Sequence, residues 1–258
     1  MRLHFLAMFG IETVFDSMPQ FLLVCLILAV AEAVYVLLGF GAGLIAVGSL
    51  ALLLPELRDV VVLLLLVNLP AELWVVYRSR RAISWRGVLV LFAAIAVGIP
   101  LGTWLLRWGR PEVLLTVLGV FLVAVGTVFV ISPSSRGRRL PDWTAPPVGL
   151  LSGLLTGLFG TGGPPLVLYY RLSGADKAAF RGQLMAIFLL MTAVRVPSYA
   201  AFGLITPTRL WSALAVMPAV LCGAAIGNRI HIEIGETTFQ RLVSAALLII
   251  GLLLLLPK

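Results

Sequence analysis

The chain has 258 residues, of which 61% are hydrophobic and only 12% are charged, and its mean hydropathy is +1.10. Soluble domains are about 45–50% apolar, so this composition excludes a soluble enzyme or binding domain and predicts an integral membrane protein. The formal net charge of +8 would suggest a nucleic-acid partner in a soluble protein, but these basic residues cluster in short segments between apolar runs and indicate membrane orientation instead.

Four segments follow one another along the chain. Residues 1–19 show no small-residue cleavage pattern, so they are predicted to be a retained N-terminal lead outside the membrane or at its interface. Residues 20–131 and 146–258 are predicted as two membrane repeats, joined by a polar, proline-rich linker at 132–145. Apolar runs in the repeats come close to the ~20 residues that a helix needs to cross the bilayer core. These runs are residues 60–67, 88–99, 113–131 and 245–256.

A glycine-rich break interrupts each repeat, as Gly-Phe-Gly-Ala-Gly at 39–43 and as Phe-Gly-Thr-Gly-Gly at 159–163. As one straight helix, residues 20–54 would extend ~52 Å, well beyond a ~30 Å bilayer core. The chain must therefore turn back, and glycine permits the backbone conformations of such a turn. Irregular backbone at membrane depth must be buried in protein or line a watery cavity. Each break thus predicts a hairpin, re-entrant or fully spanning, beside a cavity; close helix packing around the glycines is the alternative.

The two halves form a weak internal repeat. The breaks match at an offset of 119 (159 − 40), and two GxxxG motifs, at 98–102 and 223–227, match at an offset of 125 (223 − 98). A GxxxG motif in an apolar helix usually marks close packing against another helix.

Basic residues predict the orientation of the two halves, because Lys and Arg collect on the cytoplasmic side. Three basic clusters, which include the linker at 132–145, are therefore predicted to be cytoplasmic. Alternation between them gives the halves opposite topology, as in many secondary transporters. The predicted fold is an all-α integral membrane protein of two inverted-topology repeats, each a glycine-broken or re-entrant helical hairpin plus three transmembrane helices. The clusters are Arg78, Arg80, Arg81 and Arg86; Arg136, Arg138 and Arg139; and Arg171, Lys177 and Arg181.

Each break also predicts an anion site. A short helix should begin near Pro164, because proline is favoured at the first helical position, and its counterpart should begin at Leu44. The N-terminus of a helix exposes N–H donors and a partial positive charge, which suit an anion. The predicted substrate-binding residues are Gly41, Ala42, Gly43, Gly160, Thr161, Gly162 and Gly163, with Asn68 and Gln183 as polar additions.

Three ionisable side chains fall inside apolar spans, where each costs at least ~2.5–3.5 kcal/mol and so needs a partner or a task. Arg195 is predicted to face an anionic substrate, because its guanidinium suits bidentate oxyanion binding. A structural ion pair with Glu72 or Glu32 is the alternative, and the two roles are compatible. Glu32 or Glu72 is also a candidate for carrying a coupling proton.

Two other classes of function are open. An intramembrane lipid-phosphate enzyme would use the buried Glu and Arg residues, and an anion channel would lack alternating access. The only histidines, His4 and His231, lie outside the predicted cavity, so no metal site, cofactor or catalytic residue is predicted.

The glycine breaks, the inverted halves and the basic linker together resemble the sulfite exporter TauE/SafE family, also called the 4-toluene sulfonate uptake permease family. That family has a G-x-G-G-G-like stretch early in each half; here Ala42 and Thr161 each replace one glycine. The resemblance runs from about Gln20 to the end of the chain. It implies multi-pass transport in the bacterial inner membrane of a small sulfur-containing anion, such as sulfite, thiosulfate or sulfoacetate.

Overall fold

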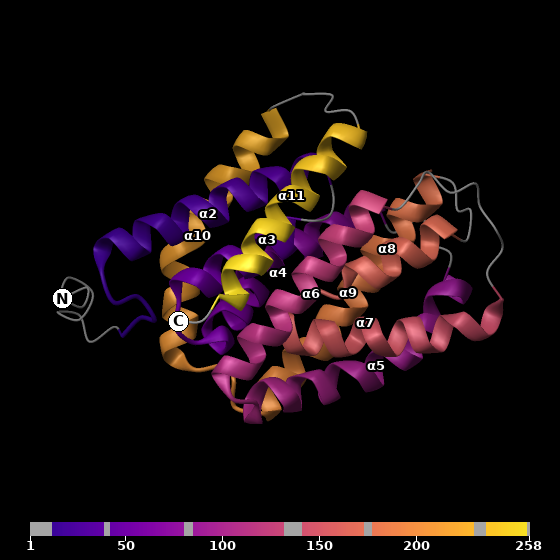
Figure 1. The fold of residues 1–258 in the computed structure, drawn as a ribbon, viewed down its shortest axis with the longest axis horizontal. Coiled ribbons are helices and arrows are strands. Elements are labelled where there is room, and N and C mark those ends of the chain that lie inside the picture. The colour runs from indigo at the N-terminus through magenta and orange to yellow at the C-terminus, as the bar shows by residue number, and fades with distance from the viewer. Residues whose placement is uncertain are drawn as a thin grey trace. The chain divides into compact units, whose positions relative to one another are not determined.

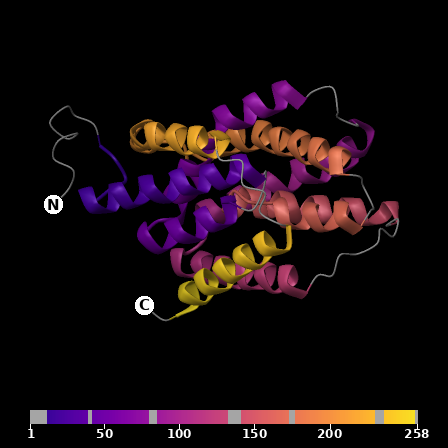
Figure 2. The same ribbon diagram turned by 90° about the horizontal axis from the view of Figure 1, so that it is seen from above.

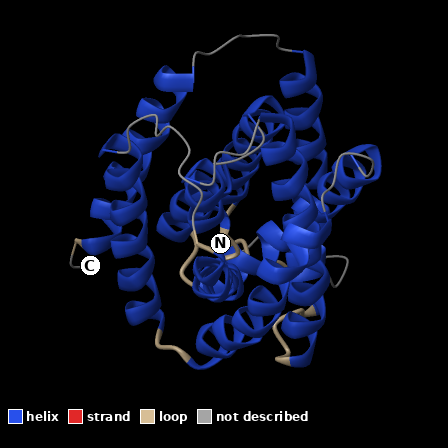
Figure 3. Cartoon of the chain, turned by 90° about the vertical axis from the view of Figure 1, so that its right-hand side faces the viewer, coloured by secondary structure: helices blue, strands red, loops and turns tan. Residues whose placement is uncertain are grey.

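The computed structural model describes residues 12–38, 42–79, 85–131, 141–172, 177–229 and 236–256. Every regular element in these ranges is helical, and no strand occurs among them (Figures 1 and 3). The predicted all-α class is therefore confirmed. The elements are α2 (Met18–Leu38), α3 (Ala42–Leu53), α4 (Leu57–Ser79), α5 (Trp85–Trp108), α6 (Pro111–Ile131), η2 (Asp142–Thr144), α7 (Ala145–Phe159), α8 (Gly163–Leu172), α9 (Lys177–Ala201), α10 (Pro207–Arg229) and α11 (Glu236–Leu255).

Several helices in the described ranges are long and apolar enough to cross a bilayer by length and composition. Four qualify, and four more apolar helices are shorter than a full span. The four long ones are Met18–Val36, Leu91–Trp108, Pro111–Ile131 and Pro207–Arg229. The shorter ones are Gly43–Leu53, Ala145–Phe159, Ala186–Ala201 and Val243–Leu255.

The helices break where the glycines predict it. The first break falls between Leu38, where α2 ends, and Ala42, where α3 begins; residues 39–41 lie outside the described ranges. The helix expected to begin at Leu44 begins two residues earlier, because alanine is the best helix former and readily joins a first turn. The second break separates α7 from α8, and α8 begins at Gly163, beside the predicted Pro164.

Contacts between Cα atoms group the chain into two compact units. Unit 1 comprises Met1–Val67, Gly109–Ile131 and Ile205–Lys258, and unit 2 comprises Asn68–Trp108 and Ser132–Leu204. Each unit therefore combines helices from both stretches predicted as repeats. The repeat boundaries at 20–131 and 146–258 stay a prediction.

In unit 2, α5 packs against α7 with almost no side chain between their backbones, and the two helices run side by side in Figure 1. A Cβ atom added to Gly102 would clash with the backbone carbonyl of Leu154, and one added to Gly98 would lie 2.5 Å from the carbonyl oxygen of Leu150. The close helix packing predicted for this GxxxG motif is confirmed.

In unit 1, the second GxxxG motif brings α10 against α2, and the two helices lie side by side in Figures 1 and 2. An added Cβ on Gly223 would clash with the carbonyl of Ala29, and one on Gly227 would lie 2.6 Å from the carbonyl oxygen of Ala33. Helices α6 and α11 also meet through glycine, since an added Cβ on Gly119 would lie 3.0 Å from the carbonyl oxygen of Gly251.

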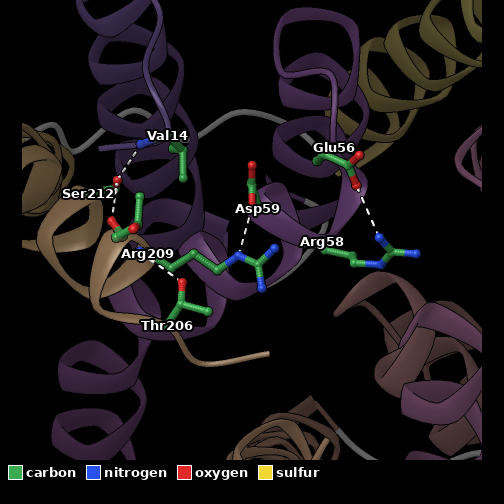
Figure 4. A network of polar contacts seen from close by, with 8 residues as sticks. Val14, Glu56, Arg58, Asp59, Thr206, Arg209 and Ser212 are labelled. Atoms are coloured by element: carbon green, nitrogen blue, oxygen red, sulfur yellow. Dashed lines mark hydrogen bonds and ion pairs between the residues drawn. The ribbon is translucent and has the colours of Figure 1, made fainter. Parts of the chain in front are cut away.

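A polar network fixes the start of α4 in unit 1 (Figure 4). Arg209 Nε donates to Asp59 Oδ1 at 2.7 Å, and both side chains are largely buried. Arg58 pairs with Glu56 at 3.3 Å and donates from Nη2 to the carbonyl oxygen of Gly109 at 3.0 Å. These contacts join the beginnings of α4, α6 and α10.

The described part of the N-terminal lead also packs within unit 1. The backbone N–H of Val14 donates to Ser212 Oγ at 2.9 Å (Figure 4). Phe15 is buried, and its ring meets the ring of Phe21 edge to face at 5.2 Å between centroids. Residues 14 and 15 therefore belong to the packed body of this unit.

We expect Gly102→Ala to lower the free energy of unfolding by about 1–3 kcal/mol, the usual cost of overpacking, because its Cβ meets the backbone of α7. The thermal unfolding of the purified protein in detergent measures this effect. The matched control is Gly43→Ala, since nothing lies within 4 Å of a Cβ added there. If Gly102→Ala melts at the wild-type temperature, the backbone contact between α5 and α7 is wrong.

Candidate functional site

The break between α7 and α8 is the best-defined irregular backbone in unit 2. Helix α7 ends at Phe159, and Gly160 follows in the left-handed conformation, with φ 73° and ψ 9°. The N–H of Gly160 donates to the carbonyl of Thr156 at 2.8 Å. This is the usual way in which glycine ends a helix, because it takes a positive φ without steric cost.

Two hydroxyl side chains on α7 fold the break back onto that helix. Ser152 Oγ donates to the carbonyl of Gly162, and Thr156 Oγ1 donates to the carbonyl of Ser152 at 2.8 Å. Both side chains are buried. A Cβ added to Gly162 would clash with the Ser152 carbonyl and with Thr156 Oγ1, so only glycine fits there.

Arg195 of α9 lies directly against the same break. Its side chain is only 5% exposed, its Nη1 donates to the carbonyl of Gly160 at 3.5 Å, and its guanidinium occupies the space that a Gly160 Cβ would need. The guanidinium carbon also lies 4.9 Å from the centroid of the Tyr199 ring, which is a cation–π contact. The structure thus brings two predicted site residues, Arg195 and Gly160, into contact.

The end of α7 explains why these groups meet. The last carbonyls of a helix have no partner within it, and they form the negative end of the helix dipole, which favours a cation. Tyr199 donates its hydroxyl to the carbonyl of Gly157 at 3.0 Å, and Arg195 donates to that of Gly160. Helix α9 therefore supplies donors and a positive charge to the C-terminus of α7.

The other predicted residues of unit 2 lie at varied distances from Arg195. Gly163 begins α8, and Thr161 is half-buried within the break. Gln183 lies on α9 twelve residues before Arg195, which is about 18 Å along a helix, so the two do not share one contact. Asn68 is half-buried on α4.

The first break belongs to unit 1. Gly43 is half-buried, and Glu32 is buried on α2 at 5% exposure. Gly41 lies outside the described residues, and so do the side chains of Ala42 and Glu72. Convergence of the two breaks on one anion, and an ion pair between Arg195 and either carboxylate, stay predictions.

Three functional candidates in the site were missed from the sequence, namely Ser152, Thr156 and Tyr199. The available signal was the spacing of Ser152 and Thr156, four residues apart on an apolar helix that leads into a break. Tyr199 follows Arg195 by one helical turn. Within the described ranges, no group of three or more His, Cys, Asp or Glu side chains could hold a metal ion.

We expect Gly160→Ala to destabilise the protein by about 1–3 kcal/mol, because alanine is strained at positive φ and its Cβ meets the guanidinium of Arg195. Gly163→Ala is the matched control, since its Cβ would lie 3.4 Å from the Phe188 ring, an ordinary contact. Thermal unfolding measures both variants. In an Arg195→Met background, Gly160→Ala should cost less, because the clash is relieved; an unchanged cost would contradict the contact.

Comparison with known proteins places the chain among membrane transporters. The family model described as "Sulfite exporter TauE/SafE" matches residues 23–254. The "Probable sulfite/organosulfonate exporter TauE" of Cupriavidus necator is 26% identical over 223 residues, which cover 85% of this chain and 87% of that protein. The "Probable inner membrane transporter protein TsaS" of Comamonas testosteroni is 24% identical over 191 residues, 74% of this chain and 80% of that one.

A more local similarity links the chain to the "Uncharacterized MFS-type transporter YhhS" of Escherichia coli, which is 32% identical over 129 residues, or 46% of this chain and 31% of that protein. No solved structure matches the chain significantly. The family and its named relatives are transporters, so the alternative of an intramembrane enzyme falls away. Because the family model spans most of its length, the chain belongs to the sulfite exporter TauE/SafE family.

Proposed function

We propose that the chain is a secondary transporter that moves a small sulfur oxyanion, sulfite or an organosulfonate such as sulfoacetate, across the bacterial inner membrane by alternating access. The observation that carries this proposal is the buried guanidinium of Arg195 against the glycine break. A buried arginine in a membrane segment is costly, and such residues commonly mark substrate pathways.

The geometry around Arg195 suits an exchange of acceptors. Its donor–acceptor distance of 3.5 Å to the Gly160 carbonyl is long for a hydrogen bond, whose usual range is about 2.7–3.2 Å. A sulfonate or sulfite oxygen is a charged acceptor and forms shorter, stronger bonds with guanidinium. Substrate oxygens would therefore compete well for the donors of this side chain.

The start of α8 adds backbone donors beside the arginine. Only two residues separate Gly160 from Gly163, where α8 begins, and the first N–H groups of a helix have no partner within it. The proposed ligands are thus the N–H groups of the break together with Arg195. The N-terminus of α3, with Gly41, Ala42 and Gly43, is proposed as a second contact, and Asn68 and Gln183 as polar groups along the path.

Helix packing supports the proposed pair of inverted repeats. The glycines of α5 meet α7, and those of α10 meet α2. These contacts are equivalent under the repeat offset, because Gly98 corresponds to Gly223 (223 − 98 = 125) and Ala29 to Gly153 (153 − 29 = 124). Two related repeats that exchange their first helices would produce this pattern. The loop charges orient the repeats oppositely and assign the linker 132–145 to the cytoplasm.

A carboxylate is proposed to couple transport to protons, with Glu32 and Glu72 as the candidates. Glu32 is buried on α2, and at the same offset it corresponds to Thr156 (156 − 32 = 124). The first repeat thus has a titratable group where the second has a hydroxyl that supports the break. A buried carboxylate that gains and loses a proton is a common relay in transporters.

The anion site is tested by binding of sulfite, sulfoacetate, sulfate and chloride to the purified protein. We expect a sulfur oxyanion to raise the melting temperature, and Arg195→Ala to weaken its binding about 10- to 100-fold, the value of hydrogen bonds to a charged group. Arg195→Lys should restore only part of the affinity, because it lacks the planar fork. The control is Arg107→Ala, whose guanidinium lies over the Trp108 ring at 5.3 Å. Unchanged affinity in both Arg195 variants would refute the site.

Proton coupling is tested in proteoliposomes with a pH gradient. We expect Glu32→Gln to bind the anion with wild-type affinity but to lose uptake driven by the gradient, because an amide cannot carry the proton. Counterflow exchange of labelled anion is the control for a functional protein. If wild-type flux ignores the gradient and simply follows the anion concentration, the protein is a channel or uniporter and the coupling proposal fails.

A further inference from the structure

We propose that Tyr199 is a positioning residue, which holds the Arg195 guanidinium against the α7–α8 break and so determines how an oxyanion meets it. This inference rests on the proposed function, in which Arg195 binds the substrate. Tyr199 itself is 0% exposed and is assigned no contact with the anion.

The first step concerns the charge of the arginine. Tyr199 lies one turn after Arg195 on α9, and its ring centroid is 4.9 Å from the guanidinium carbon. The face of an aromatic ring attracts a cation without carrying a formal charge. A carboxylate in this position would also hold the arginine, but it would compete with the substrate. The tyrosine ring supports the cation and leaves its full positive charge for an anion.

The second step concerns the orientation of the ring. The Tyr199 hydroxyl donates to the carbonyl of Gly157 at 3.0 Å, so the ring is tied to the last turn of α7. Arg195 in turn reaches the carbonyl of Gly160, one turn further along. Since that second bond is long at 3.5 Å, it restricts the guanidinium weakly. The ring face is therefore the stronger restraint on the plane of the guanidinium.

The third step is specificity. A guanidinium whose plane is fixed can present two parallel N–H groups to two oxygens of one sulfur oxyanion. Chloride is spherical and gains nothing from that alignment. Loss of the ring support should therefore reduce sulfite binding more than chloride binding, because it frees the guanidinium to rotate while its charge remains.

The experiment replaces Tyr199 in the full chain with phenylalanine and with its mono-, di- and trifluorinated analogues, which keep the ring shape but progressively remove its negative face. The Kd values of sulfite and chloride are measured on purified protein. We expect the sulfite Kd to rise stepwise along the series, by about 2- to 30-fold in all, while the chloride Kd changes less than the sulfite Kd. In an Arg195→Met background the series should be flat.

The same series at Tyr170 is the control, because this tyrosine is also buried in unit 2 and its ring packs on Tyr169 at 5.5 Å between centroids. A sulfite Kd that stays constant along the Tyr199 series, or rises equally in the Arg195→Met background, overturns the positioning role alone. If wild-type protein binds no sulfite, or Arg195→Met binds it normally, the proposed function fails and the positioning role fails with it.

Discussion

The site depends on one constraint, which is that a helix broken inside a membrane must find donors for its last carbonyls. Water satisfies these groups in soluble proteins, but lipid cannot. In this chain α9 supplies the donors, through the hydroxyl of Tyr199 on Gly157 and the guanidinium of Arg195 on Gly160. Ser152 adds a bond to the carbonyl of Gly162. The break therefore persists because side chains replace the missing helical hydrogen bonds.

The same constraint reconciles a structural and a functional role for Arg195. A cation at the C-terminus of α7 stabilises the helix dipole, which accounts for its burial without any substrate. However, the guanidinium has five N–H donors, and one long bond to a carbonyl does not exhaust them. A residue that the fold must keep charged and in place is already preorganised for an anion. The cost of holding a charge in the membrane is thus shared between folding and binding.

Glycine made much of this architecture predictable. The breaks, the start of α8 beside Pro164 and the close packing at Gly102 all follow from what glycine and proline allow a backbone to do. The partner of each helix did not follow, because a GxxxG motif indicates a close approach but not the helix approached. Ser152, Thr156 and Tyr199 were also missed, since a hydroxyl in an apolar run reads as ordinary packing until the carbonyl that it satisfies is known. Gln183 was grouped with Arg195 by polarity, whereas three helical turns separate them.

The two repeats differ in charge at equivalent positions, and this difference bears on how transport is driven. Arg195 corresponds to Glu72 (195 − 72 = 123), and Thr156 corresponds to Glu32. The second repeat thus combines an arginine that stays charged at every physiological pH with neutral hydroxyls, which suits an anion. The first repeat has carboxylates, which can exchange protons. Duplication followed by this divergence would assign substrate to one half and coupling to the other, and a charged substrate could then move together with a compensating proton.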